Sequence, residues 1–247
     1  MASVTEAETG GVARIAALDL ARTAALAGMV IYHFTFDLAL FGYVPPATAI
    51  TGGWALFAKL VAGSFLFLAG VSLWLAHGRG MRWPAFWRRL GVVTGAAFLV
   101  TAATYVAMPQ SFIYFGILHS IAACSLIGLA FLRLPAPATL AVALAVFLLP
   151  QYVRFDALNA PWFWWTGLGT YWPPTLDYEP VFPWLAPFLA GLALARGLDL
   201  SGRLPRPRVP GPVARRLAWP GRHSLIIYLV HQPVLIAGLW LVTQAIR

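Results

Sequence analysis

The chain has 247 residues, of which 60% are hydrophobic and only 10% are charged. Soluble domains carry roughly 25% charged residues, so this composition excludes a soluble globular protein and indicates an integral membrane protein. The net charge of +9 does not indicate a nucleic-acid partner, because the basic residues stand at the ends of apolar runs without a DNA- or RNA-binding motif. The one cysteine, Cys124, lies in an apolar run, which excludes a disulfide framework and a thiolate metal site.

The chain begins with a polar tail, residues 1–13, and residues 14–247 are predicted to form a single membrane domain. We do not expect the tail to be a signal peptide, because it carries two glutamates and the first apolar run holds charges and is too long. Seven apolar runs approach or exceed the roughly 20 residues that a membrane span requires. They cover residues 16–41, 52–77, 86–107, 112–132, 135–151, 180–197 and 223–245. The predicted fold is therefore an all-α bundle of seven transmembrane helices.

The distribution of basic residues predicts the orientation of these helices. Fourteen of the 17 Lys and Arg residues fall on the side of the N-terminus, and the other three are Lys59, Arg154 and Arg247. The fourteen are Arg14, Arg22, Arg79, Arg82, Arg88, Arg89, Arg133, Arg196, Arg203, Arg206, Arg208, Arg215, Arg216 and Arg222. By the positive-inside rule, the N-terminus is cytoplasmic and the C-terminus is extracytoplasmic. We expect a multi-pass protein of a bacterial cytoplasmic membrane, in contact with membrane lipid.

A tryptophan-rich segment, residues 151–179, separates the fifth and sixth runs. An eighth span within residues 157–174 is rejected, because this stretch is short, is rich in Pro and Gly, and would place the Arg-rich segment 203–216 outside. The segment is predicted to be an external loop. Its aromatic side chains favour an interfacial belt over a sugar-stacking platform. They are Trp162, Trp164, Trp165, Tyr171 and Trp172.

The first apolar run carries Asp19, Arg22, His33 and Asp37. At about 100° per residue, these four fall on one side of a helix. Ionisable groups in hydrocarbon are costly unless they face a protein interior or a water-filled cavity. The stripe therefore predicts a buried functional site.

Histidines and a lysine on other helices lie at a similar depth. His33, His119 and Lys59 are each about 10 Å from the outer ends of their helices at 1.5 Å per residue, and His231 is nearer the membrane centre. Asp37, one turn beyond His33, can accept a hydrogen bond from its imidazole or neutralise Lys59.

The first run has the pattern Asp19-x-x-Arg22 followed, after ten residues, by His33. This pattern resembles that of the transmembrane acyltransferases. Five blocks in order are similar to bacterial relatives of the heparan-α-glucosaminide N-acetyltransferase catalytic domain, and cover nearly the whole chain from Arg14. The Arg22-x10-His33 spacing and the block around His231 also resemble the acyltransferase-3 family. The five blocks are RIAALDLARTAALAGMVIYHFTFD (14–37), FLFLAGVSL (65–73), FGILHSI (115–121), DYEPVFPW (177–184) and GRHSLIIYLVHQP (221–233).

The resemblance implies that acyl-CoA, with acetyl the expected acyl group, binds on the cytoplasmic side and that an extracytoplasmic acceptor, a glycan, sugar or amine, receives the acyl group. Arg22 and His33 carry over from the acyltransferase-3 motif. The chain departs from these families at two positions. Thr23 replaces the usual glycine of the motif. His33 stands where the lysosomal member of the N-acetyltransferase family has an asparagine, and that enzyme has its catalytic histidine in the following loop. Residues 42–53 contain no histidine, and the chain lacks the luminal domain, so heparan is not the expected acceptor.

Acyl transfer requires a base, an oxyanion donor and a cationic site for phosphates. We expect His33 to be the base, assisted by Asp37 and His119. Arg22 lies about 16 Å from His33 along the helix, a suitable distance for the phosphate end of a pantetheine arm. The oxyanion donor is left open among His119, Lys59, Ser64 and Thr35. The further candidates are Arg88, Arg89 and Arg222 for the cofactor, Lys59, Asp177 and Trp184 for the acceptor, and Asp19, Tyr228 and His231 for structural roles.

Three other functions share some of these features. A proton-coupled transporter also uses intramembrane Asp, His and Lys, although the chain has no internal repeat. A haem protein would use His33 and His119 as iron ligands. A retinal protein is not expected, because the only lysine, Lys59, is on the second helix. We predict no bound metal, and we leave homo-oligomerisation open.

Overall fold

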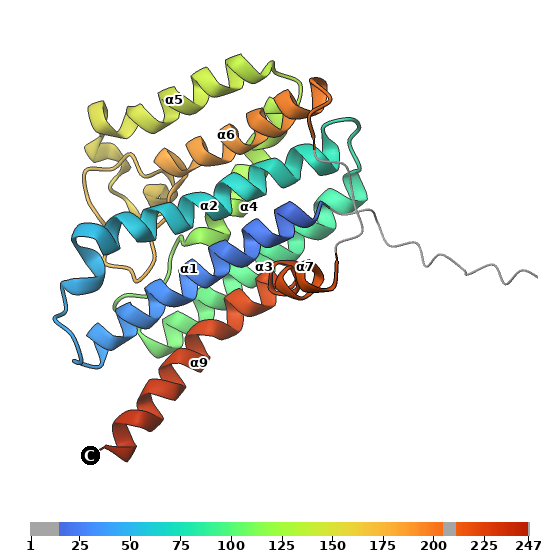
Figure 1. The fold of residues 1–247 in the computed structure, drawn as a ribbon. Coiled ribbons are helices and arrows are strands. Elements are labelled where there is room, and N and C mark those ends of the chain that lie inside the picture. Colours follow the sequence, from blue (N-terminus) through green and yellow to red (C-terminus); the bar gives the residue numbers. More distant parts are fainter. Residues whose placement is uncertain (1–14, 205–210, 247) are drawn as a thin grey trace, which may run out of the picture.

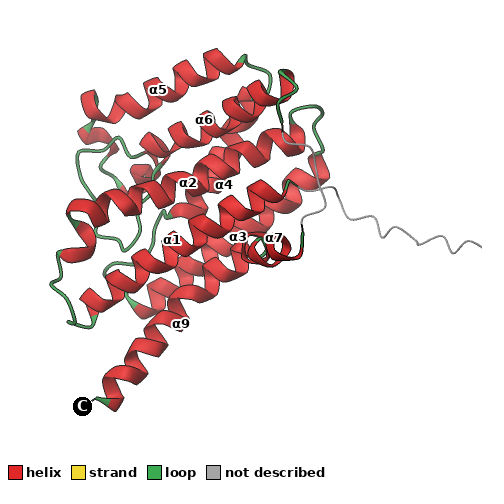
Figure 2. Ribbon diagram, viewed as in Figure 1, coloured by secondary structure: helices red, strands yellow, loops and turns green. Residues whose placement is uncertain are grey.

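The structure, a computed structural model, describes residues 15–204 and 211–246. The polar tail 1–13, Arg14, Arg206, Arg208 and Arg247 lie outside the described residues. Within the described ranges, helices and their connections make up the fold, and the only extended pairings are two isolated bridges (Figure 2).

Each of the seven predicted runs contains a helix. These are α1 (Ala16–Leu40), α2 (Gly52–His77), α3 (Trp83–Ala107), α4 (Ile117–Gly128), α5 (Ala136–Tyr152), α6 (Val181–Leu200) and α9 (Ser224–Ala245). Two short helices, α7 (Pro212–Leu217) and α8 (Trp219–Arg222), precede α9. By length and composition, α1, α2, α3, α6 and α9 qualify as membrane spans, whereas α4 and α5 are shorter apolar helices. The seven-span count and the orientation stay predictions.

The largest boundary difference is at α4, which begins at Ile117 although the apolar run begins at residue 112. Gly116 has an extended backbone, and Asp177 accepts a hydrogen bond from the Ile117 amide, 3.1 Å away, at the start of the helix. The Asp177 carboxylate thus satisfies an amide that the first turn of a helix leaves without a partner. A distant side chain, and not the local hydropathy, fixes this boundary.

The long helices run broadly alongside one another, with α9 more steeply inclined (Figure 1). The connections α2–α3 and α4–α5 lie at the end where α1 begins and α6 ends, which we call the inner end (Figure 1). The connections α1–α2, α3–α4 and α5–α6 lie at the opposite, outer end, together with the end of α9 (Figure 1). This alternation agrees with the predicted gathering of arginines at one end of the bundle.

Two glycines allow α2 and α6 to pack closely. A Cβ at Gly70 would lie 1.9 Å from the carbonyl oxygen of Phe188, and one at Gly191 would lie 2.1 Å from that of Phe67. Each helix therefore presents a glycine to the backbone of the other. Small residues at such interfaces are typical of helices that associate in lipid, where van der Waals contact replaces the hydrophobic effect.

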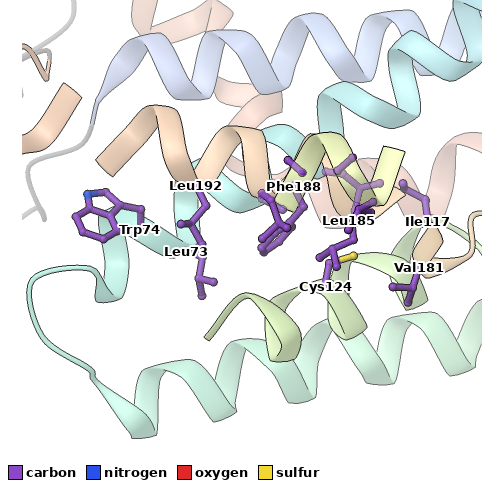
Figure 3. Close-up of a cluster of buried hydrophobic side chains, with 14 of the residues drawn as sticks. Leu73, Trp74, Ile117, Cys124, Val181, Leu185, Phe188 and Leu192 are labelled. Atoms are coloured by element: carbon purple, nitrogen blue, oxygen red, sulfur yellow. The ribbon is translucent and has the colours of Figure 1, made fainter. Parts of the chain in front are cut away.

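The apolar core lies between α2, α4 and α6 (Figure 3). Leu66, Phe188, Leu189 and Leu192 are fully buried there. Cys124 is also fully buried, in keeping with its place in an apolar run. The helices α1 and α9 flank this core and carry the buried polar residues Asp19, Asp37 and His231.

The tryptophan-rich connection between α5 and α6 forms two 3-10 turns, Asp156–Leu158 and Pro161–Thr166, and no long helix. Trp162 and Trp172 are exposed. In contrast, the Trp164 indole donates to the carbonyl of Asn159, and its backbone carbonyl accepts from the Tyr178 hydroxyl. The absence of a helix in this described segment agrees with the rejection of an eighth span.

Candidate functional site

A cavity of ≈ 440 Å³ lies among α1, α2, α3, α4 and α9. Three of the arginines proposed from the sequence line it together: Arg22 from α1, and Arg88 and Arg89 from α3. Most of the remaining wall is apolar, and Tyr228 of α9 contributes a hydroxyl-bearing ring. The cavity therefore combines three guanidinium groups with a mostly apolar wall.

Arg22 is held by neighbours on two helices. Its guanidinium donates to Asp19, 3.0 Å away on the preceding turn of α1, and to the Ser72 hydroxyl of α2 at 2.7 Å. The second carboxylate oxygen of Asp19 lies 3.6 Å from Arg222 of α8. The buried Asp19 thus lies beside two candidate phosphate ligands, Arg22 and Arg222, and its structural role stays a prediction.

The turn α8 packs directly on the backbone of α1. A Cβ at Gly221 would lie 1.9 Å from the carbonyl oxygen of Asp19, so only glycine fits there. Thr23 joins the two segments, since its hydroxyl donates to the carbonyl of Leu217 and accepts from the Gly221 amide. The sequence showed Thr23 only as a departure from the family glycine, whereas its hydroxyl ties α7 and α8, which precede α9, to α1.

Two acidic residues, Asp177 and Glu179, lie beside the start of α4. Ile117, whose side chain lines the cavity, donates its amide to Asp177. Burial raises the pKa of Asp177 to about 6. Burial and the neighbouring Asp177 raise the pKa of Glu179 well above its usual range, and Lys59 lowers it in part. The Glu179 Oε2 atom is buried and has no hydrogen-bond partner among the described residues.

Two histidines meet between α1 and α9. The ring centroids of His33 and His231 are 4.8 Å apart. His231 is buried, and its Nδ1 bonds to the backbone carbonyl of Tyr228, one turn earlier on α9. Its Nε2 is buried and lacks a hydrogen-bond partner within the described residues. The sequence assigned His231 only a structural role, but its ring lies directly beside the proposed base.

Asp37 was expected to bond to His33 or to neutralise Lys59, and the structure shows a different partner. The Asp37 side chain is fully buried and accepts a hydrogen bond of 2.6 Å from Gln232 of α9. Within the described residues, no hydrogen bond or ion pair joins Asp37 to His33 or to Lys59. Asp37 therefore fixes α9 beside α1 in this structure.

His119 has surroundings of its own. Its Nε2 lies 3.3 Å from the Thr101 hydroxyl of α3, and its ring contacts Phe98 and Phe115. α4 packs mainly on α2, α3 and α6, whereas His33 faces α9. His33 and His119, which were predicted to lie at equal depth along the membrane normal, thus contact different helices. This weighs against their use as paired haem ligands.

The two other proposed acceptor-binding residues also lie apart from the cavity wall. Lys59 is exposed on α2, and Glu179 lies within its electrostatic reach. Trp184 packs at the margin of the apolar core, within 3.7 Å of where a Cβ at Gly63 would lie. Of the proposed acceptor set, Asp177 is the residue that the structure connects to the cavity, through Ile117.

Sequence analysis missed Glu179, Gln232 and Ser72. Glu179 is one of only eight acidic residues and lies two positions after Asp177, a scarcity that could have marked it. Gln232 directly follows His231, but neutral amides are common and gave no signal. Across residues 15–204 and 211–246, no group of three or more His, Cys, Asp or Glu side chains is placed to hold a metal ion.

Comparison with known families gives one match over most of the chain. The family model described as Heparan-alpha-glucosaminide N-acetyltransferase, catalytic, matches residues 14–233. No curated protein and no solved structure matches the chain. The matched range contains all five sequence blocks and every candidate residue named above.

Proposed function

Because the chain belongs to the heparan-alpha-glucosaminide N-acetyltransferase catalytic-domain family, and is thus a membrane transferase, we propose that it moves an acetyl group from acetyl-CoA to an extracytoplasmic acceptor. The acceptor is a glycan, a sugar or an amine. The expected location is the bacterial cytoplasmic membrane, with the inner end of the bundle in the cytoplasm.

The observation that carries this proposal is the arginine-lined cavity. Arg22, Arg88 and Arg89 open onto one cavity, and guanidinium groups bind phosphate through paired, charge-assisted hydrogen bonds. The apolar wall that continues to Tyr228 suits the pantetheine arm of the coenzyme. His33 lies about 16 Å from Arg22 along α1, so a thioester can approach it while the phosphates stay at the inner end.

In the proposed reaction, His33 takes the proton of the acceptor as the acceptor attacks the thioester carbonyl. The C–S bond then breaks, and the coenzyme leaves as its thiol after protonation. Thr35 and Ser64 donate their hydroxyls to carbonyls of their own helices, at Ile31 and Val61. Tyr228, which lines the cavity, is therefore preferred to these two residues as the oxyanion donor.

Calorimetry of acetyl-CoA binding to the detergent-purified full chain tests the proposal. We expect micromolar binding that survives His33→Ala and weakens about tenfold or more in Arg89→Ala, since a hydrogen bond to a charged group contributes about 1.5–3 kcal/mol. Arg133→Ala is the control, because Arg133 is exposed and lies outside the cavity wall. Absence of binding in folded protein would contradict the proposal and favour a transporter.

A further inference from the structure

The contact between His33 and His231 extends the proposed chemistry to a residue on the last helix. We propose that the two imidazoles form a proton relay, in which His33 takes the proton of the acceptor and passes it to Nε2 of His231. This inference rests on the proposed acyltransferase function. It assigns His231 a positioning and proton-holding role that neither the motif spacing nor the family match indicates.

The hydrogen bond at Nδ1 of His231 supports the first step of the inference. A backbone carbonyl only accepts hydrogen bonds, so Nδ1, which bonds to the carbonyl of Tyr228, carries the hydrogen. In the neutral ring, Nε2 then holds the lone pair. A histidine whose tautomer is fixed by its second nitrogen is a typical arrangement for a proton acceptor.

The surroundings of Nε2 support the second step. The His231 side chain is buried, and Nε2 has no hydrogen-bond partner among the described residues. A buried polar atom without a partner is costly and calls for a functional explanation. The ring of His33 is adjacent, with 4.8 Å between the centroids and no direct hydrogen bond to Nε2, so the proton passes between the rings through one bridging water.

The position of the pair relative to the cavity supports the third step. Tyr228 lines the cavity, and His231 stands three residues further along α9, a rise of about 4.5 Å. The pair thus lies just beyond the end of the channel proposed for the thioester. Next to it, Gln232 and Asp37 are hydrogen-bonded to each other, which holds α9 at this distance from α1.

The proton balance of the step is complete. As the acceptor forms its bond to the acetyl carbon, its X–H bond breaks and the proton moves to His33 and then to His231. The C–S bond breaks with its electron pair on sulfur. The proton held by the pair finally protonates the departing thiolate, so the products are the acetylated acceptor and CoA thiol, and both imidazoles are neutral again.

The test compares variants of His231 in the purified full chain, with glucosamine as the acceptor probe and release of CoA thiol as the readout. His231→Asn retains an amide donor in place of Nδ1–H but removes the basic nitrogen. We expect its thermal midpoint and acetyl-CoA affinity to match wild type, while kcat falls about 10²-fold or more. In His231→Ala, added imidazole should restore part of kcat, an effect that a purely structural role would not produce.

His223→Asn is the matched control. The Nδ1 of His223 also bonds to a backbone carbonyl, that of Trp219 at 3.0 Å, but the His223 side chain is exposed. This variant should keep the wild-type rate. A wild-type rate in His231→Asn, or a loss in His231→Ala that imidazole leaves unchanged, would overturn the relay and leave the proposed function intact. If folded wild-type protein binds no acetyl-CoA and releases no thiol, the proposed function fails and the relay with it.

Discussion

The inner and outer halves of the interface around α1 and α9 present opposite hydrogen-bonding groups. The inner half holds guanidinium donors, those of Arg22, Arg88 and Arg89 in the cavity and that of Arg222 beside Asp19. In the outer half, the buried atoms without partners among the described residues can all accept hydrogen bonds. They are Asp37 Oδ2, Glu179 Oε2, His231 Nε2 and Gln232 Oε1.

On the proposed function, the two halves bind different ligands. Donors with fixed positive charge suit phosphates, whereas neutral imidazoles and carboxylates suit a group that gives up a proton. Helix α1 and the α8–α9 segment contribute to both sets, since Arg22 precedes His33 on α1 and Arg222 precedes His231 across the α8–α9 junction. The predictions below test whether the two halves separate as binding and chemistry.

The largest expected effect is in the outer half. His33→Ala should lower kcat by about 10²- to 10⁴-fold, the usual contribution of a positioned general base. The affinity for acetyl-CoA should stay unchanged, because His33 does not line the cavity. Steady-state kinetics and calorimetry on the same preparation measure both quantities. An equal loss of affinity would remove the distinction between the two halves.

A smaller effect is expected in the inner half for Arg22→Lys. The Arg22 guanidinium donates to Asp19 and to Ser72 at the same time, and a lysine ammonium cannot match that planar fork. We expect affinity for acetyl-CoA to fall about tenfold, with kcat at saturating donor close to wild type. Arg133→Lys, outside the cavity wall, is the control. Unchanged affinity in Arg22→Lys would separate Arg22 from phosphate binding.

The α2–α6 contact serves as a structural reference outside both halves. Gly70→Ala should destabilise the protein by about 1–3 kcal/mol, the usual cost of overpacking, because the new Cβ would meet the Phe188 carbonyl at 1.9 Å. Gly95→Ala on α3 meets no atom within 4 Å and should be neutral or slightly stabilising. Thermal unfolding in detergent measures both, and equal midpoints would contradict the close packing.

The smallest expected effect concerns Asp177 and pH. Its pKa is raised to about 6, so the folded state holds this proton more tightly than the unfolded state does. Its contribution to stability is therefore present at low pH and is lost as pH rises from about 4 to 6, by about 1–3 kcal/mol at most. Asp177→Asn retains an acceptor for the Ile117 amide and should flatten this dependence. An unchanged pH profile of the thermal midpoint would contradict the shift.

The helices were predictable because each apolar run is long and bounded by charged residues, prolines or glycines. The clustering of Arg22 with Arg88 and Arg89 was partly predictable, since the positive-inside rule places these arginines at one end. That they share one cavity was not, because hydropathy does not report the order in which helices pack. The late start of α4 at Ile117 was not predicted for a related reason. Asp177, which accepts the hydrogen bond from the Ile117 amide, is 60 residues away.

The outer half shows more clearly which features a single sequence does not predict. Helical rise predicts a similar depth for His33 and His119, but depth carries no information about direction around the bundle, and the two histidines face different helices. Asp37 was expected to bond within its own helix or to Lys59, yet its partner is Gln232, 195 positions later. Such pairings follow from the packing of α9 on α1, and a single sequence does not encode that packing in any local pattern.

The docking of α8 and α9 on α1 also bears on how the protein is made. Thr23 and Gly221, which lock these segments together, are 198 residues apart. During synthesis, α1 is therefore present long before its partners, and Arg22, His33 and Asp37 must wait in the bilayer or the insertion machinery without Arg222, His231 and Gln232. The proposed site is completed only when α9 follows, so a chain interrupted before α9 holds the preceding helices without the His33–His231 contact.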